Sequence, residues 1–198
     1  HGKCPQPSQS SEFSPLFDPE AVSRQFIQSD WHLLVGYRGV MRHQELSEAC
    51  SKSQEHLLAY VMDVIGEKLT GNAILKGGMV LRLTDSPRLT NDLDYVFTPF
   101  KSKKDIVDIL LDCLNDIQGV SCSHTLNSKC LRIFLSTENN ISVQVEASAM
   151  PECAYSTMTT QILAKKYGLP PRIIRIMSFE VALANKLAAW CERRLIRD

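Results

Sequence analysis

The sequence lacks a long apolar run, a cysteine framework and a net charge, and each absence argues against a class of protein. No stretch approaches the roughly 20 apolar residues that span a bilayer, and no basic segment followed by an apolar one marks a secretory signal. The seven cysteines are odd in number and irregularly spaced, and none forms a C-x-x-C pair, which disfavours a disulfide scaffold or a structural zinc site. Free thiols suit a reducing compartment, so the sequence predicts a cytoplasmic protein that does not enter a membrane.

The charge is balanced overall, with 22 basic and 22 acidic residues, which favours a small or local nucleic-acid contact over a long basic groove. Basic residues nevertheless concentrate in the stretch 161–198, while the rest of the chain is acidic on balance. This asymmetry is consistent with metals on one wall of a site and phosphates on the other. A solvated basic helix face explains it equally well.

Hydrophobic periodicity predicts a mixed order of helices and strands. The expected helices are Ser53–Leu69, Met79–Leu83, Lys103–Ile117 and Ser178–Ile196. The expected strands are 73–75, Asp92–Phe97, 131–135 and 141–147. Two adjacent strands joined by a turn at 138–140 favour an α+β core over a regular βαβ alternation.

Three regions are expected along the chain. Residues 1–20 are rich in Ser, Pro and Gln without a period, which predicts a tail or arm. Residues 21–150 would form the core, and residues 151–198 a helical C-terminal part. The last expected helix is still in progress at Asp198, so this part is expected to be either truncated or unusually small.

Asp92 and Asp94 carry the strongest chemical signal. They stand two apart on a predicted strand, which places both carboxylates on one face with Leu93 on the other. Adjacent carboxylates repel each other unless a cation lies between them or one keeps its proton. Two Mg²⁺ ions are one solution, although an isolated D-x-D pair is more often a solvated turn.

Three other features strengthen the metal hypothesis, and each has a plainer explanation. Lys76-Gly77-Gly78 ends a strand and opens a helix, so its backbone could approach a phosphate, or it could be an ordinary turn. Glu146 lies on the polar side of its strand, where it could be a third ligand or simply face solvent. Lys186 interrupts the apolar stripe of the last helix nearly in line with Arg193, which suggests an anionic partner or a snorkelling side chain.

Two signatures in order resemble those of the AbiE-type toxin nucleotidyltransferases, a group that includes the MenT-like toxins within the DNA polymerase β-like superfamily. The first is Ile74-Leu75-Lys76-Gly77-Gly78 followed by Arg88-Leu89-Thr90-Asn91-Asp92-Leu93-Asp94. The second is Ala184-Asn185-Lys186-Leu187-Ala188-Ala189 with Arg193 and the final Arg197-Asp198. The resemblance covers 74–198 and departs from the family at Asn185, where the family has Glu, and at Gly78, where many relatives have Ser.

The resemblance implies a polymerase β-like core with a mixed sheet flanked by helices, and it implies roles for single residues. The nucleotide would be bound by Lys76, Gly77, Gly78, Thr90, Lys186 and Arg193. The metal ligands would be Asp92, Asp94 and Glu146. The catalytic residues would be Asp92, Asp94, Lys186 and Asp198, the last acting near the acceptor.

By this resemblance the protein would use Mg²⁺ or Mn²⁺ to move a nucleoside monophosphate from an NTP to a hydroxyl. The acceptor would be RNA, including tRNA, and the enzyme would be a toxin restrained by a cognate antitoxin protein. One alternative is a non-catalytic domain that keeps the fold to bind a nucleotide or a protein, which Asn185 and the short C-terminal part favour. Another is nucleotidylation of a small molecule, which shares the chemistry and differs in the acceptor.

Overall fold

The computed structural model of the protein describes residues 53–128 and 130–193, and the side chains through Cys191. The helices are α3 (Gln54–Lys68), α4 (Gly78–Leu83), α5 (Lys104–Asn115), α6 (Gln161–Tyr167) and α7 (Phe179–Arg193). The strands are β1 (Ala73–Lys76), β2 (Asp92–Phe97), β3 (Val120–Leu126), β4 (Leu131–Thr137), β5 (Ser142–Ala149), β6 (Tyr155–Thr159) and β7 (Ile173–Met177). The predicted tail 1–20 lies outside the described residues.

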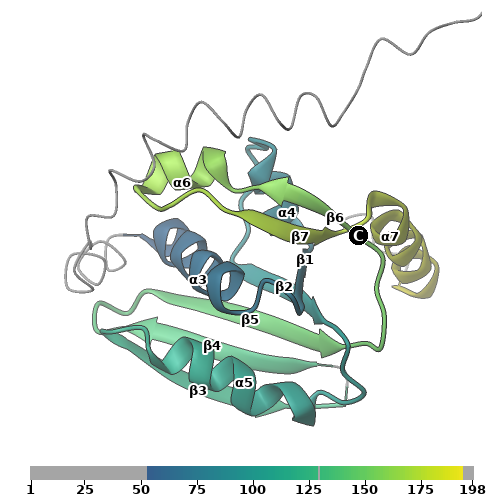
Figure 1. Ribbon diagram of the computed structural model, residues 1–198, viewed down its shortest axis with the longest axis horizontal. Helices are drawn as coiled ribbons and strands as arrows, with labels where there is room; N and C mark the ends of the chain where they lie inside the picture. The colour runs from purple at the N-terminus through teal and green to yellow at the C-terminus, as the bar shows by residue number, and fades with distance from the viewer. Residues whose placement is uncertain (1–52, 129, 194–198) are drawn as a thin grey trace, which may run out of the picture. The chain divides into compact units, whose positions relative to one another are not determined.

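The seven strands form one mixed sheet in the order β3-β4-β5-β2-β1-β7-β6 (Figure 1). β2 pairs with β5 in parallel and β1 pairs with β7 in parallel, while the other neighbours are antiparallel. β1 and β2 are therefore central strands, enclosed on both sides by later parts of the chain. This arrangement confirms the expected α+β architecture with a mixed sheet.

The first described helix, α3, illustrates how local signals and burial agree. Ser53 caps it by accepting a hydrogen bond from the backbone N–H of His56, and the helix ends at Lys68, one residue before the predicted end at Leu69. Its apolar residues are almost completely buried, including Leu57, Val61 and Ile65 at 0% exposure. The helix is held mainly by this burial against the sheet.

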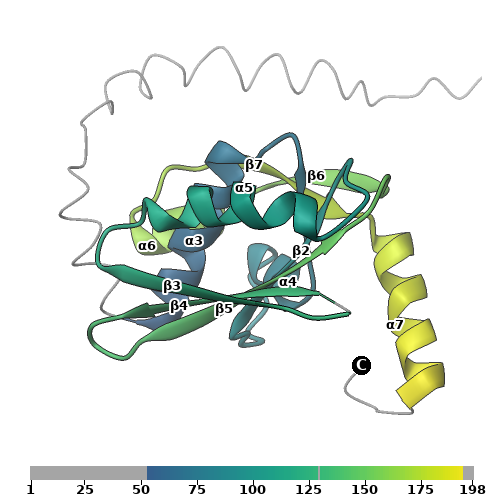
Figure 2. The same cartoon turned by 90° about the horizontal axis from the view of Figure 1, so that it is seen from below.

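One face of the sheet carries the main hydrophobic core. Alternate residues of the strands point into it together with the apolar faces of α3, α4, α5 and α6. The opposite face has only a small apolar cluster of Ile74, Val96 and Met177, against which Val181 and Ala182 of α7 pack. Figure 2 shows α5 lying over β3 and β4, with α7 at the other end of the sheet.

The C-terminal part differs from the expectation of a purely helical segment. Residues 151–198 contain α6 and α7 but also β6 and β7, which extend the same sheet. β7 pairs with β1 through its backbone, and this pairing holds Ile174 and Ile176 in the main core. The boundary at residue 150 stays a prediction. No helix in the described ranges is long and apolar enough to cross a membrane.

Candidate active site

The two aspartates of β2 lie on the face of the sheet opposite the main core. Asp92 and Asp94 are partly exposed, whereas Leu93 between them is fully buried at 0% exposure. Asp94 stands opposite Lys76 of β1 on one side and opposite Glu146 of β5 on the other. Because paired residues share a face, these strands place the four charged residues on one face of the sheet.

The aspartate pair is electrostatically strained. Burial raises the pKa of Asp94 to about 6, and the neighbouring negative charge of Asp92 adds to the rise. The charge of Glu146 also raises this pKa, while Lys76 and Lys186 lower it. A cation placed at the pair would relieve the repulsion from Asp92, which is the second cause of the raised pKa of Asp94 after burial.

Thr90 fixes the position of Asp92. Its hydroxyl donates a hydrogen bond to Oδ1 of Asp92 over 2.8 Å. A side chain at Gly78 would come within 2.9 Å of Oγ1 of Thr90, so this glycine leaves the space that Thr90 occupies. Thr90 was predicted to bind the nucleotide. In the structure it orients the carboxylate of Asp92, a role that was not predicted.

Gly77 is required by both backbone conformation and space. Its φ is +76°, a conformation that L side chains rarely adopt. A Cβ at this position would also collide with Oδ2 of Asp94. The turn between β1 and α4 therefore passes directly against the carboxylate, which brings the predicted phosphate-binding and metal-binding residues into one place.

Glu146 is close to the aspartate pair in register, but its carboxylate is held from the other side. Oε1 accepts hydrogen bonds from Nε of Arg132 and Nε2 of Gln144, both over 2.8 Å. Oε2 lies 3.9 Å from Sγ of Cys130. Within the ranges 53–128 and 130–193, no three His, Cys, Asp or Glu side chains are arranged to hold a metal ion. Glu146 therefore stays a predicted third ligand.

Asp92 and Asp94 fit a hard divalent cation. They supply adjacent carboxylate oxygens, the ligand type that Mg²⁺ prefers, and the turn at Gly77 leaves one of these oxygens uncovered by a side chain. Burial first, and the charge of Asp92 second, raise the pKa of Asp94, so both the desolvation and the repulsion disfavour the charged pair in the absence of a cation. The donor set is thus suited to Mg²⁺ or Mn²⁺.

Lys186 is exposed on α7, and it is close enough for its charge to lower the pKa of Asp94. α7 contacts the sheet through Val181 and Ala182. The apolar stripe beside Lys186 is therefore not part of the core. The stripe residues are 51–60% exposed, namely Phe179, Leu183, Leu187 and Trp190. The side chain of Arg193 and the whole of Asp198 lie outside the described part, so their predicted roles stay predictions.

The side chains that hold Glu146 in place were not predicted from the sequence. Arg132 and Gln144 bind Glu146, and both lie on the polar side of apolar-polar alternating strands. The alternation of apolar and polar residues predicts the face of the sheet on which Arg132 and Gln144 lie. The register that pairs Arg132 with Glu146 cannot be predicted in this way, because it depends on the turn between β4 and β5.

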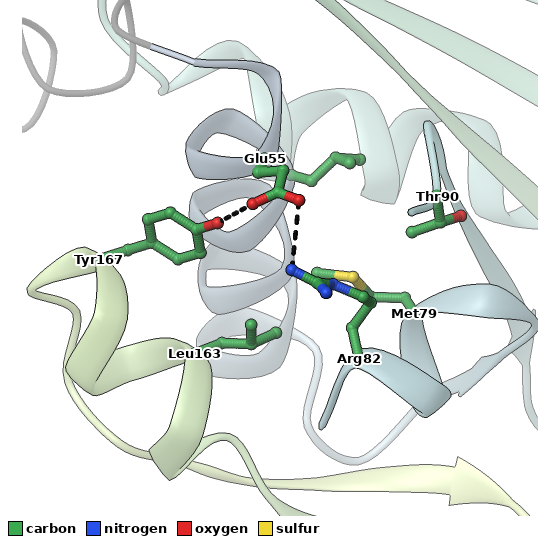
Figure 3. A pocket seen from close by; sticks show the side chains of 7 residues that line it. Glu55, Met79, Arg82, Thr90, Leu163 and Tyr167 are labelled. Carbon is green, nitrogen blue, oxygen red and sulfur yellow. Dashed lines mark hydrogen bonds and ion pairs between the residues drawn. The ribbon is translucent and has the colours of Figure 1, made fainter. Parts of the chain in front are cut away.

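A second polar cluster lies behind the glycine turn and was also missed. Glu55 of α3 accepts hydrogen bonds from Tyr167 and Lys166 of α6 and from Arg82 of α4. The hydrogen bond from Tyr167 is the main reason why the pKa of Glu55 is lowered. Glu55, Arg82 and Tyr167 line a small pocket together with Met79 and Thr90 (Figure 3). The cluster ties α4, the helix that follows the glycines, to the rest of the fold.

Comparisons with known proteins place the chain in a family. A family model described as "Nucleotidyl transferase AbiEii toxin, Type IV TA system" matches residues 65–198, more than half of the chain. This range contains β1, the glycine turn, both aspartates and α7. No curated protein matches the sequence.

Among solved structures, JHP933 from Helicobacter pylori is similar with 17% identity and a TM-score of 0.46 over 69% of this chain. The Bradyrhizobium diazoefficiens CD-NTase CdnG in complex with GTP is similar with 17% identity and a TM-score of 0.30, also over 69%. The match covers 58% of the JHP933 chain and 44% of the CdnG chain.

Proposed function

The chain belongs to the AbiEii family of nucleotidyltransferase toxins, and on this premise we propose that it transfers a nucleoside monophosphate from an NTP to a hydroxyl group. The acceptor is proposed to be RNA, with tRNA as the first candidate. One observation carries the proposal: the glycine turn of β1 packs directly against Asp94, beside Asp92, on the open face of the sheet. This packing supports the proposal, because groups suited to phosphate lie next to groups suited to a cation.

The residues divide the task between charge and position. Asp92 and Asp94 are proposed to hold Mg²⁺ or Mn²⁺, with Glu146 available as a third ligand. Bound Mg²⁺ would supply Lewis acidity at the reacting phosphate and favour ionisation of the acceptor hydroxyl. Thr90 keeps Asp92 in position through its 2.8 Å hydrogen bond. Gly77 and Gly78 let the turn pack against Asp94 and Thr90, and its backbone N–H groups are proposed to contact the phosphates.

The basic residues would face the phosphates. Lys76 and Lys186 carry positive charge toward the aspartates, as their effect on the pKa of Asp94 indicates. In the reaction, the acceptor oxygen forms a bond to the α-phosphorus, the bond to the bridging oxygen breaks and pyrophosphate leaves. Lys76, Lys186 and Arg193 would stabilise the charge that develops on the leaving pyrophosphate. Asp198 is proposed to act near the acceptor hydroxyl.

The biological setting follows from the same premise. We propose a cytoplasmic toxin whose activity a cognate antitoxin restrains. The test is incubation of the protein with each labelled NTP, Mg²⁺ and total RNA, followed by separation of the labelled products. Label on RNA that depends on Mg²⁺ and on Asp94 is expected. NTP binding without transfer to RNA or to small hydroxyl compounds would favour a non-catalytic nucleotide-binding domain instead.

A further inference from the structure

Four charged residues form a row across four neighbouring strands. Arg132 of β4 is in register with Glu146 of β5, Glu146 with Asp94 of β2, and Asp94 with Lys76 of β1. The two carboxylates thus lie in the middle of the row, with a basic residue at each end. Adjacent strands are about 4.8 Å apart, so each inner carboxylate has one charged neighbour on either side.

The carboxylate of Glu146 could pair with either of two positive charges, Arg132 on β4 or a cation bound at the aspartates. In the structure it is bound to the arginine side. Arg132 and Gln144 both donate to the same oxygen over 2.8 Å, and the other oxygen lies toward Cys130, just before β4. Within the part of the chain that the structure describes, the hydrogen bonds of this carboxylate therefore involve β4, the residue before β4, or its own strand.

We propose that Arg132 is a positioning residue that holds Glu146 out of the metal centre. Asp92 and Asp94 bind the cation while Arg132 is paired, and Glu146 joins them as a third ligand when the arginine is removed or drawn away. The inference rests on the proposed function, because it needs a cation at the aspartate pair. It also explains why Glu146 is adjacent to Asp94 in register without the three carboxylates forming a metal cluster.

The ion pair between Arg132 and Glu146 is expected to be weak, because both side chains are partly exposed to solvent. The side chains of Arg132 and Glu146 are 44% and 26% exposed, so solvent screens the ion pair. Pairs of this kind are weak, and the competition with a metal ion should amount to a few-fold change in affinity rather than orders of magnitude. A restraint of this size can be overcome by any anion that binds Arg132 in place of Glu146.

The test is Mn²⁺ binding to the full chain without nucleotide, measured from the signal of free Mn²⁺ by electron paramagnetic resonance. Arg132→Met keeps the stem of the side chain and removes the donor. It is expected to tighten Mn²⁺ binding about fivefold. Glu146→Gln alone is expected to change the affinity by less than about twofold, because Glu146 is paired with Arg132 in the wild type.

The double variant separates a released ligand from simple charge removal. If Arg132 acts through Glu146, Arg132→Met should have no effect in the Glu146→Gln background. Tightening that persists in that background would mean that loss of positive charge alone attracts Mn²⁺, which overturns the inference. So would unchanged affinity in Arg132→Met, or a Glu146→Gln variant that loses as much affinity as Asp94→Asn.

Asp94→Asn distinguishes failure of this inference from failure of the proposed function. If Asp94→Asn abolishes Mn²⁺ binding while Arg132→Met changes nothing, the proposed site stands and only the role of Arg132 is wrong. If the wild type binds no Mn²⁺, or Asp94→Asn binds it equally well, both are wrong. Arg175→Met, which removes a positive charge from β7, is the control and should leave the affinity unchanged.

Discussion

The two faces of the central strands differ completely in chemistry although they are made by alternate residues of the same segments. On one face of β2, Leu93, Tyr95 and Phe97 are at most 3% exposed and belong to the main core. On the other face, Asp92 and Asp94 are partly exposed and lie against the glycine turn. Stability and chemistry therefore occupy neighbouring positions but separate residues, and substitutions one position apart should have different consequences.

The largest effect is expected on the polar face. Asp94→Asn or Asp92→Asn removes a charge that the cation needs, and transfer should fall about a thousandfold or more, roughly 4 kcal/mol of transition-state stabilisation. Thermal stability without metal should be unchanged or slightly higher, because the repulsion between the two carboxylates is relieved. Transfer assays and melting curves on the same samples check both parts, and full activity in either variant would remove the aspartates from the mechanism.

On the buried face the expected loss is of stability. Leu93 lies between the two aspartates in the sequence, but its side chain is fully buried in the core. Leu93→Ala should therefore lower the free energy of unfolding by about 2–5 kcal/mol. Leu89→Ala, at a side chain 71% exposed, is the matched control and should change it by less than about 0.5 kcal/mol. Urea unfolding compares the two, and equal losses would contradict the assignment of Leu93 to the core.

Gly77 affects both stability and the site, because it has a positive φ and packs directly against the carboxylate of Asp94. Gly77→Ala places a Cβ at positive φ against Oδ2 of Asp94, so it should cost about 1–3 kcal/mol of stability and displace the carboxylate. Gly71→Ala has no atom within 4 Å of its added Cβ and is the control. Urea unfolding and Mn²⁺ binding are the measurements, and a Gly77→Ala variant with wild-type values in both would contradict the close packing.

The smallest effect is expected at Lys186, whose side chain is exposed. Lys186→Met should weaken NTP binding in Mg²⁺ about tenfold and leave stability within about 0.5 kcal/mol of the wild type. Lys186→Arg should restore it poorly, since a planar fork does not replace a compact point charge. Titration calorimetry measures the affinities, with Lys165→Met on α6 as the control. Equal NTP affinities for wild type and Lys186→Met would make Lys186 a surface residue.

The site's central strand could be predicted because its signals are local. The alternation around Leu93 gave β2 its bounds and faces, and the glycines after Lys76 gave the turn before α4. β7 was not predicted, because a run such as Ile173–Met177 becomes a strand only through pairing with the distant β1. The ion pair of Arg132 with Glu146 was hidden for a related reason, since register depends on how two strands meet.

The central claim is that the polar face of β2 transfers a nucleotide, and the position of the transferred label tests it most directly. The protein is incubated with Mg²⁺, RNA and an NTP labelled at either the α- or the γ-phosphate. The account predicts that the α label appears on RNA and that the γ label leaves in pyrophosphate. With Asp94→Asn, neither labelled RNA nor labelled pyrophosphate should form. Label from the γ position on the acceptor, or α transfer that persists in Asp94→Asn, would contradict it.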